Sequence, residues 1–298
     1  MTIASCFLLP EGAILSADST TTYIEPSDPT QPPIVRYFQH GQKIFEVGEE
    51  GTLALVTWGC GDLGDKSYRT IIAEFADLID QGKVSDMAGA VEQWRQLFWQ
   101  AYQAAFAPQI QAARQLTMVP PVDARLRKVL EAIVTTLTVG FCIAGRYGSD
   151  RTPSASVFIF APTQTGPPNP QPVKMGDLLF WGWPALVNRM ALGFDPDILG
   201  MIIGSGKWSG TPQELFQVMS QKALKLPRIM PLRDAIELSY SMIDATIKTM
   251  KFSHLPHTCG GPIEIALLRT DRPFKWVTHK SFTAALDLTK GNIDGIQR

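Results

Sequence analysis

The sequence predicts an α+β layered domain in which two β-sheets lie between two layers of helices. Candidate strands, rich in β-branched and aromatic residues, are grouped in three places along the chain, and amphipathic helices separate the groups. Strands and helices that are segregated in this way favour an α+β arrangement over alternating βαβ units. The chain has 298 residues, 45% of them apolar and 18% charged, so it can bury a full core without disulfides or metal.

The N-terminal part predicts two pairs of strands. The turn residues Pro10, Glu11 and Gly12 separate the first two apolar runs and predict a hairpin. A polar, proline-rich loop at 26–33 precedes the second pair, which ends where Gly59, Cys60 and Gly61 break the pattern. The expected strands are residues 3–9, 13–18, 42–47 and 52–58.

Apolar residues spaced three or four apart predict the first helices. In residues 66–81 this spacing is shown by Ile71, Ile72, Phe75 and Ile79. A longer helix over 86–116 carries a cluster of aromatic residues (Trp94, Phe98 and Trp99) that is expected to pack against the domain or a neighbour, and Pro108 is expected to kink it. A short basic helix is predicted at 124–133.

The rest of the chain predicts strands, helices and strands again. The segment 166–172 is proline-rich and predicts a turn. The predicted strands are residues 136–144, 155–161, 177–181, 262–269 and 274–279. The predicted helices are residues 211–224 and 231–252, with 184–204 helical in part.

We find no internal repeat and no linker, so we expect one domain over residues 1–298. Insertions are expected near 26–36 and 104–130, and the polar tail after residue 283 is expected to be peripheral. The net charge of −1 argues against a nucleic-acid partner, because phosphate binding needs a basic surface. No segment is long and apolar enough to predict a membrane span.

Scattered cysteines and an N-terminal stretch that does not fit a signal peptide predict a cytoplasmic protein. Cys6, Cys60, Cys142 and Cys259 stand singly, which favours reduced thiols over a disulfide framework. The apolar stretch 3–17 lacks the basic start of a signal peptide and has a turn in its middle.

Thr2 is the first residue to which we assign chemistry. A small second residue permits removal of Met1, which would leave Thr2 at the N-terminus. A hydroxyl is a weak nucleophile without a base within hydrogen-bond reach. An N-terminal threonine carries its own base, because its α-amine has a pKa of about 7.7. Many proteins begin with Met-Thr, so Thr2 gains weight only from the residues that lie beyond it.

The residues after Thr2 form an ordered series. Asp18 ends the strand Gly-Ala-Ile-Leu-Ser-Ala-Asp sixteen positions later and is followed by Ser19; Lys43 begins another strand, and Gly59 ends the next. This series resembles the N-terminal half of proteasome β-subunits and of the related bacterial peptidase HslV. In that family an N-terminal Thr heads a strand, and Gly-(apolar)₃-Ala-Ala-Asp-Ser follows at the same distance. A later Cys-Gly-Gly at 259–261 is similar to the family's Ser-Gly-Gly turn.

The resemblance implies a fold and a mechanism. The fold would be the four-layer αββα sandwich of the Ntn-hydrolase type, and the activity that of a threonine-type endopeptidase. Thr2 would be the nucleophile, and Lys43, kept charged by Asp18, would lower the hydroxyl pKa. The Gly59 N–H would be the oxyanion donor. The resemblance also implies supporting roles for Ser19, Cys259 and Gly260 and a substrate-backbone contact for Thr22, and we place Thr57 near the predicted substrate pocket.

No cofactor and no metal are implied. The expected substrate is a peptide or an unfolded protein. Copies of the chain are expected to assemble into a ring that hides the sites, and an ATPase partner of unknown identity is compatible with such a ring.

Two departures from the family pattern concern the groups around the terminal amine. The family's Gly-Ser-Gly turn corresponds either to residues 181–184, which contain no serine, or to Gly204, Ser205 and Gly206. Its Asp corresponds to Pro256, and its Ser to Cys259. These departures keep open a non-catalytic structural subunit of a proteasome-like assembly, and an Ntn amidase that acts on small non-peptide amides.

Three other motifs give weaker evidence of a function. Ser205 does not complete a nucleophile elbow, because Ile203 stands where that motif has glycine. Lys207 does not complete a phosphate-binding loop, since Trp208 follows it. His254, His257 and Cys259 suggest zinc but lack a fourth ligand.

Overall fold

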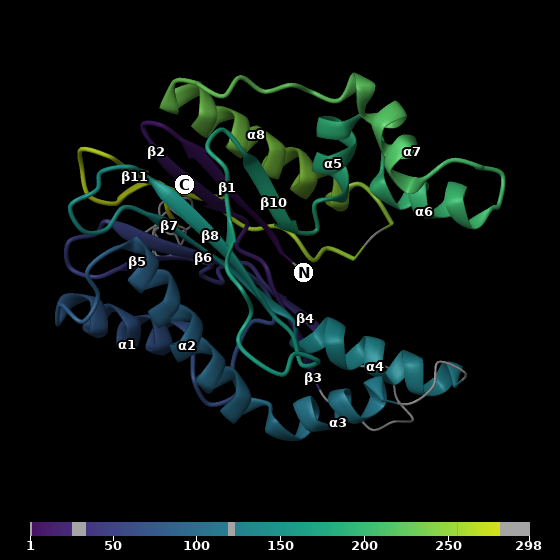
Figure 1. The fold of residues 1–298 in the computed structure, drawn as a ribbon, viewed down its shortest axis with the longest axis horizontal. Helices are drawn as coiled ribbons and strands as arrows, with labels where there is room; N and C mark the ends of the chain where they lie inside the picture. Colours follow the sequence, from purple (N-terminus) through teal and green to yellow (C-terminus); the bar gives the residue numbers. More distant parts are fainter. Residues whose placement is uncertain (1, 26–33, 119–122, 255, 281–298) are drawn as a thin grey trace, which may run out of the picture.

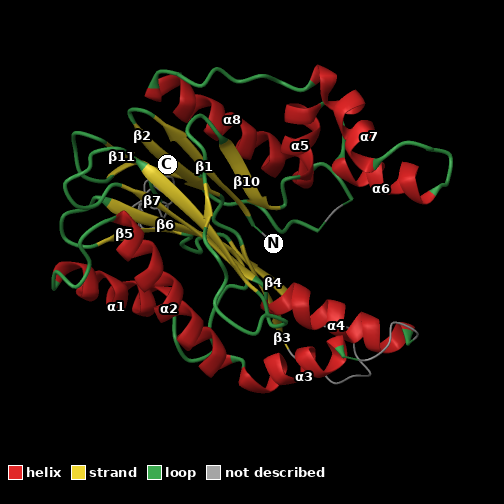
Figure 2. Ribbon diagram, viewed as in Figure 1, coloured by secondary structure: helices red, strands yellow, loops and turns green. Residues whose placement is uncertain are grey.

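Two five-stranded antiparallel sheets form the centre of the computed structural model, which describes residues 2–25, 34–118, 123–254 and 256–280 (Figure 1). Helices cover the outer side of each sheet, as the colouring by secondary structure makes plain (Figure 2). The prediction of an α+β chain is therefore confirmed, with strands that pair antiparallel throughout the described sheets.

The first sheet joins segments from both ends of the chain. Its strand order is β10-β1-β2-β11-β12. The bounds are β1 Ile3–Leu9, β2 Gly12–Ala17, β10 Leu178–Gly182, β11 Glu264–Arg269 and β12 Lys275–Thr278. β1 and β2 form the predicted hairpin, in which Ala4 lies opposite Ala17. β10 covers the other edge of β1, with Gly182 opposite Ile3.

The second sheet has the strand order β5-β6-β7-β8-β9. Its bounds are β5 Ile44–Val47, β6 Leu53–Gly59, β7 Val139–Gly145, β8 Ser154–Phe160 and β9 Gln171–Pro172. A separate two-stranded sheet pairs β3 Thr21–Glu25 with β4 Ile34–Phe38. β3, β4 and the two-residue β9 are not predicted from the sequence, and β9 lies within the segment 166–172 that is expected to be a turn.

The helices divide into two groups. In the sequence, α1 to α4 come after β5 and β6, and α5 to α8 come after β10. The bounds are α1 Tyr68–Asp80, α2 Met87–Ala105, α3 Ala107–Thr117, α4 Ala124–Leu137, α5 Ala185–Leu192, α6 Pro196–Gly204, α7 Pro212–Met219 and α8 Leu232–Lys251, with a 3-10 turn at Ser220–Lys222. The helix predicted over 86–116 is broken at Phe106, just before Pro108, and the one predicted to end at residue 133 continues to Leu137.

Three apolar clusters account for the packing. Small side chains fill the space between the two sheets, among them Ala4, Cys6, Ala54 and Ala144. Aromatic residues fill the space between the second sheet and α1 and α2, and these include Trp94, Phe98, Phe141 and Phe160. A third cluster lies between the first sheet and α8 and contains Ile14, Met242, Ile243 and Ile265. The aromatic cluster predicted on the helix is thus core of the domain.

Some expectations lie partly or wholly outside the described residues. Residues 26–33 of the insertion expected near 26–36 lie outside the described part of the chain. Met1 and the whole tail after residue 283 also lie outside it. The insertion expected near 104–130 covers α3 and the start of α4. Within the described part of the chain, no helix has the length and apolar character needed to cross a bilayer.

Candidate functional site

Contacts to its backbone hold Thr2 in place. It stands directly before β1 and is only 5% exposed. Its carbonyl oxygen accepts a hydrogen bond of 2.8 Å from the Trp183 N–H. Gly182 lies so close to that oxygen, with φ +86°, that a Cβ there would stand 1.9 Å from it. The segment that follows β10 therefore fixes Thr2 from the side opposite β2.

Asp18 is fully buried at the end of β2 and accepts four hydrogen bonds. Oδ1 accepts from the Ile3 N–H at 3.0 Å and from Lys43 Nζ at 2.5 Å. Oδ2 accepts from the Thr20 N–H at 3.1 Å and from the Gly260 N–H at 2.9 Å. All four come from different segments, so this carboxylate ties together the start of β1, the end of β2, the start of β5 and the turn before β11.

Lys43 brings a buried positive charge from the other sheet. It precedes β5, and its side chain is 7% exposed. Its carbonyl oxygen accepts from the Thr57 N–H at 2.9 Å, which extends the pairing of β5 with β6 by one residue. A buried ammonium is costly unless it is paired, and Asp18 supplies the pairing here.

The Gly59 N–H points toward the same region. In an antiparallel ladder, successive N–H groups point to opposite sides of the strand. The Thr57 N–H is directed at β5 and the Cys60 N–H at Thr138 beside β7, so the Gly59 N–H is directed past the start of β5. Gly59 has φ +90°, and a Cβ at this position would stand 2.3 Å from the Thr138 carbonyl oxygen.

These residues meet at one small cavity of about 70 Å³. Five of the residues predicted for the site line it: Thr2, Thr22, Lys43, Thr57 and Gly59. The Thr22 hydroxyl is buried and has no hydrogen-bond partner among the described residues. The Thr57 hydroxyl, by contrast, donates to the Gly140 carbonyl oxygen at 3.1 Å. Within the described chain, the Thr22 hydroxyl is therefore free of the internal pairing that occupies the Thr57 hydroxyl.

The three predicted supporting residues lie behind this cavity. Gly260 donates to Asp18, and its carbonyl oxygen accepts from the Ser19 N–H at 2.9 Å. Ser19 Oγ donates to the Pro262 carbonyl oxygen at 2.7 Å. Burial, with a smaller contribution from the Asp18 carboxylate and with Lys43 acting in the opposite direction, raises the pKa of the Cys259 thiol to about 12. The Cys259 thiol is therefore protonated at neutral pH.

The structure distinguishes the two candidate counterparts of the serine turn. Residues 181–184 adjoin Thr2 through Gly182 and Trp183. Ser205, at the end of α6, is exposed, and its hydroxyl donates to the Ile202 carbonyl oxygen at 2.7 Å. Ser205 is not among the described residues that line the cavity, whereas the segment with no serine borders Thr2.

Sequence reasoning missed several residues around the cavity. Trp58 and Trp181 stack across the two sheets, with ring centroids 4.5 Å apart and planes 4° apart. Gly140 makes room for this stack, since a Cβ there would stand 2.0 Å from the Trp58 ring. Tyr68 also lines the cavity, and its hydroxyl donates to the Cys60 carbonyl oxygen at 2.5 Å. In the sequence, a glycine inside the strand β7 is the signal that a large side chain lies against that strand.

The geometry does not support a zinc site at His254, His257 and Cys259. No group of three or more His, Cys, Asp or Glu side chains within the described ranges is placed to hold a metal ion. Cys259 lies beside Asp18 and Lys43 instead, in the apolar environment that raises its pKa.

Comparison with solved structures finds Anbu proteins. The chain matches a structure titled Anbu (Gly-1) mutant from Hyphomicrobium sp. strain MC1 with a TM-score of 0.51 and 12% identity, over 100% of both chains. It also matches Anbu (ancestral beta-subunit) from Yersinia bercovieri with a TM-score of 0.48 and 11% identity, over 99% of this chain and 94% of that one. The Hyphomicrobium structure supports the α+β fold, and at this identity it shows the fold alone.

No protein-family model matches the chain. No curated protein matches it either. The assignment to proteasome β-subunits and the related peptidase HslV is therefore corrected: the Hyphomicrobium neighbour is an Anbu protein, and it is only 12% identical to this chain.

Proposed function

We propose that the chain is an N-terminal-threonine hydrolase that cleaves amide bonds in peptides, with Thr2 as nucleophile after removal of Met1. The observation that carries the proposal is the shared cavity: Thr2, the Asp18-held Lys43 and the Gly59 N–H border one small space. An exposed threonine at this position would not indicate a nucleophile, but Thr2 is buried and fixed in position.

The proposed reaction has two steps. Thr2 Oγ1 attacks the substrate carbonyl carbon, and its proton passes to the α-amine of the same residue and then to the leaving amine. The resulting ester is hydrolysed by water, which restores the hydroxyl. The positive charge of Lys43 favours the alkoxide character of Oγ1 during attack.

Substrate positioning is assigned to backbone and hydroxyl groups. The Gly59 N–H stabilises the oxyanion, because a backbone donor fixed by a strand needs no reorganisation when charge develops. The unpartnered Thr22 hydroxyl contacts the substrate backbone. Thr57, tied to Gly140, shapes the floor of the pocket.

The proposal extends to architecture and assembly. The order of helices, sheet, sheet and helices is proposed to be the αββα sandwich of the Ntn-hydrolase type, formed by one domain over residues 1–298. Assembly of copies into a ring is also proposed. Large exposed apolar side chains on α6 and α7 support it, with Met201 73% exposed and Val218 56% exposed. Light scattering coupled to size-exclusion chromatography tests this part separately.

The decisive experiment is the intact mass of the chain before and after incubation with a peptide epoxyketone, which needs a hydroxyl and a free α-amine on one residue. A chain without Met1 that gains one adduct on Thr2 supports the proposal. Retention of Met1, or its loss without an adduct, favours a non-catalytic structural subunit instead. If an adduct forms but a peptide panel is not cleaved, an amidase acting on small amides is favoured.

Substitution of Thr2 provides a second test. Thr2→Ala removes the nucleophile and leaves the backbone hydrogen bond to Trp183 intact. We expect loss of hydrolysis with an unchanged thermal unfolding midpoint. Activity that persists in this variant would show that another group attacks the substrate.

A further inference from the structure

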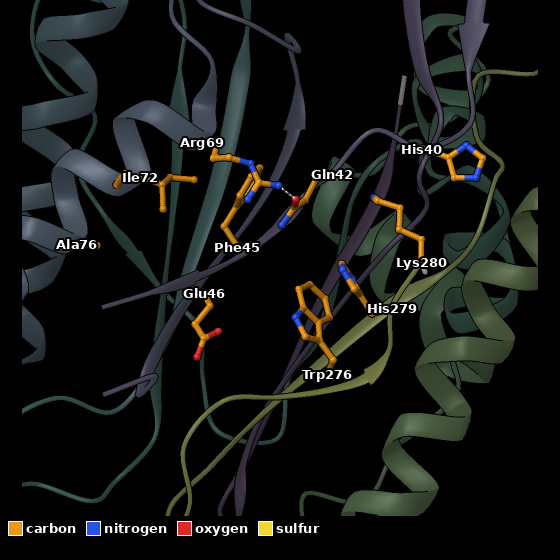
Figure 3. Close-up of a pocket in the computed structure, with 11 residues that line it drawn as sticks. His40, Gln42, Phe45, Glu46, Arg69, Ile72, Ala76, Trp276, His279 and Lys280 are labelled. Carbon is orange, nitrogen blue, oxygen red and sulfur yellow. Dashed lines mark hydrogen bonds between the residues drawn. The ribbon is translucent and has the colours of Figure 1, made fainter. Parts of the chain in front are cut away.

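A second, larger cavity of about 700 Å³ lies beside the candidate site (Figure 3). It is bordered by α1, by β5 with the loop before it, and by the end of β12. None of the chemistry proposed above uses it. Gln42 borders both cavities, so the two are neighbours across the residue that precedes Lys43.

The walls of this cavity combine apolar surface with nitrogen donors. Phe45, Ile72 and Trp276 supply apolar surface. Arg69, His40, His279 and Lys280 supply nitrogen donors, and Figure 3 shows Arg69 on the same side of the cavity as Ile72 and the acidic residue Glu46, with His40 and Lys280 on the other side. A cavity lined by apolar side chains and nitrogen donors is complementary to a molecule that has an apolar or aromatic body and an anionic group at one end.

The donors are positioned by contacts to other residues. Lys280 Nζ lies 2.9 Å from Oε2 of the fully buried Glu264 and donates to the Gly41 carbonyl oxygen at 2.9 Å. His279 stacks on Trp276 with centroids 4.2 Å apart, and its Nδ1 lies 2.7 Å from Glu264 Oε1. Arg69 donates to Gln42 Oε1 through Nη2, which leaves other guanidinium N–H groups available.

We propose that this cavity binds a small aromatic carboxylate, with the carboxylate on Arg69 and the ring against Trp276. Arg69 is the residue of choice because its planar guanidinium donates two parallel hydrogen bonds to a carboxylate. The same arginine, with Lys280, holds the loop residues Gly41 and Gln42 that lead to Lys43. Ligand binding would thus act on the position of Lys43, a consequence that rests on the proposed function; the binding itself does not.

The test measures binding by calorimetry, with 2-naphthylacetate as probe and its uncharged amide, 2-naphthylacetamide, as comparison. We expect saturable binding of the acid to one site per chain, and binding of the amide at least about tenfold weaker, because hydrogen bonds to a charged acceptor are stronger than those to a neutral one. Hydrogen exchange with bound acid should slow in residues 40–46, 69–76 and 276–280. No saturable binding, equal binding of acid and amide, or protection confined to other segments would overturn the proposal.

Two variants and one control locate the site. Arg69→Gln should weaken binding of the acid about tenfold and leave binding of the amide unchanged. Ala73→Phe places a ring in the cavity from the exposed side of α1 and should weaken binding of both probes. Arg125→Gln, the same change on exposed α4, should alter neither (Figure 1). None of these measurements depends on hydrolysis, so their outcome is independent of the proposed threonine mechanism.

Discussion

Replacement of Asp18 by asparagine tests the arrangement around Thr2 most directly. Each carboxylate oxygen accepts two hydrogen bonds, one pair from Ile3 and Lys43 and the other from Thr20 and Gly260. An asparagine keeps the shape but turns one oxygen into an NH₂ donor. In either orientation that NH₂ faces two donors, so two of the four hydrogen bonds are lost.

The cost follows from burial. Removing one partner of a buried ion pair costs about 3–5 kcal/mol, and an orphaned buried donor costs about 1–3 kcal/mol. Lys43, with a side chain only 7% exposed, loses its counter-charge in Asp18→Asn. We expect the free energy of unfolding to fall by about 4–8 kcal/mol, a large share of the roughly 5–15 kcal/mol typical of folded proteins.

Urea unfolding followed by far-ultraviolet circular dichroism measures this loss. The matched control is Asp244→Asn, since Asp244 pairs with Lys248 on the surface and should contribute under about 1 kcal/mol. The double variant Asp18→Asn with Lys43→Met should be more stable than the single Asp18 variant, because it removes the unpaired charge. A loss under about 1 kcal/mol in Asp18→Asn would refute the view that this carboxylate is the buried junction of the site.

Two further predictions concern glycines and thiols. Gly182→Ala should destabilise the chain by at least about 2 kcal/mol more than Gly206→Ala, measured by the same urea titration. Both residues have positive φ and share the backbone penalty, but only Gly182 lies against the Thr2 carbonyl oxygen; equal losses would argue against that close contact. Iodoacetamide at pH 8, followed by peptide mass spectrometry, should label half-buried Cys60 before Cys259, because burial raises the pKa of Cys259 to about 12 and keeps the thiol protonated until far higher pH. Faster labelling of Cys259 would contradict both its burial and the direction of its pKa.

The parts of the site that sequence alone predicts are those set by local geometry. The turn at 10–12 fixes the register of the first hairpin, so Asp18 falls beside the start of β1. Short apolar runs likewise predict β5 and β6, the second of which ends at Gly59, and apolar residues three or four apart predict α1.

The remaining parts depend on contacts between distant segments. Lys43 belongs to one sheet and Asp18 to the other, and only the stacking of the sheets brings them together. The register that places Trp183 against Thr2 joins strands far apart in the sequence, and no local turn specifies it. Strands β3 and β4 flank the proline-rich residues 26–33, whose composition concealed the pairing on either side of them.

The stack of Trp58 on Trp181 gives the protein an optical reporter of its own. Two parallel indoles at this separation couple their electronic transitions, and the coupling disappears as soon as the sheets slide or part. Although the chain has seven tryptophans, the described structure places only this pair face to face across the two sheets, next to the segment that holds Thr2. Near-ultraviolet circular dichroism can therefore follow the packing around the candidate site without any label being added.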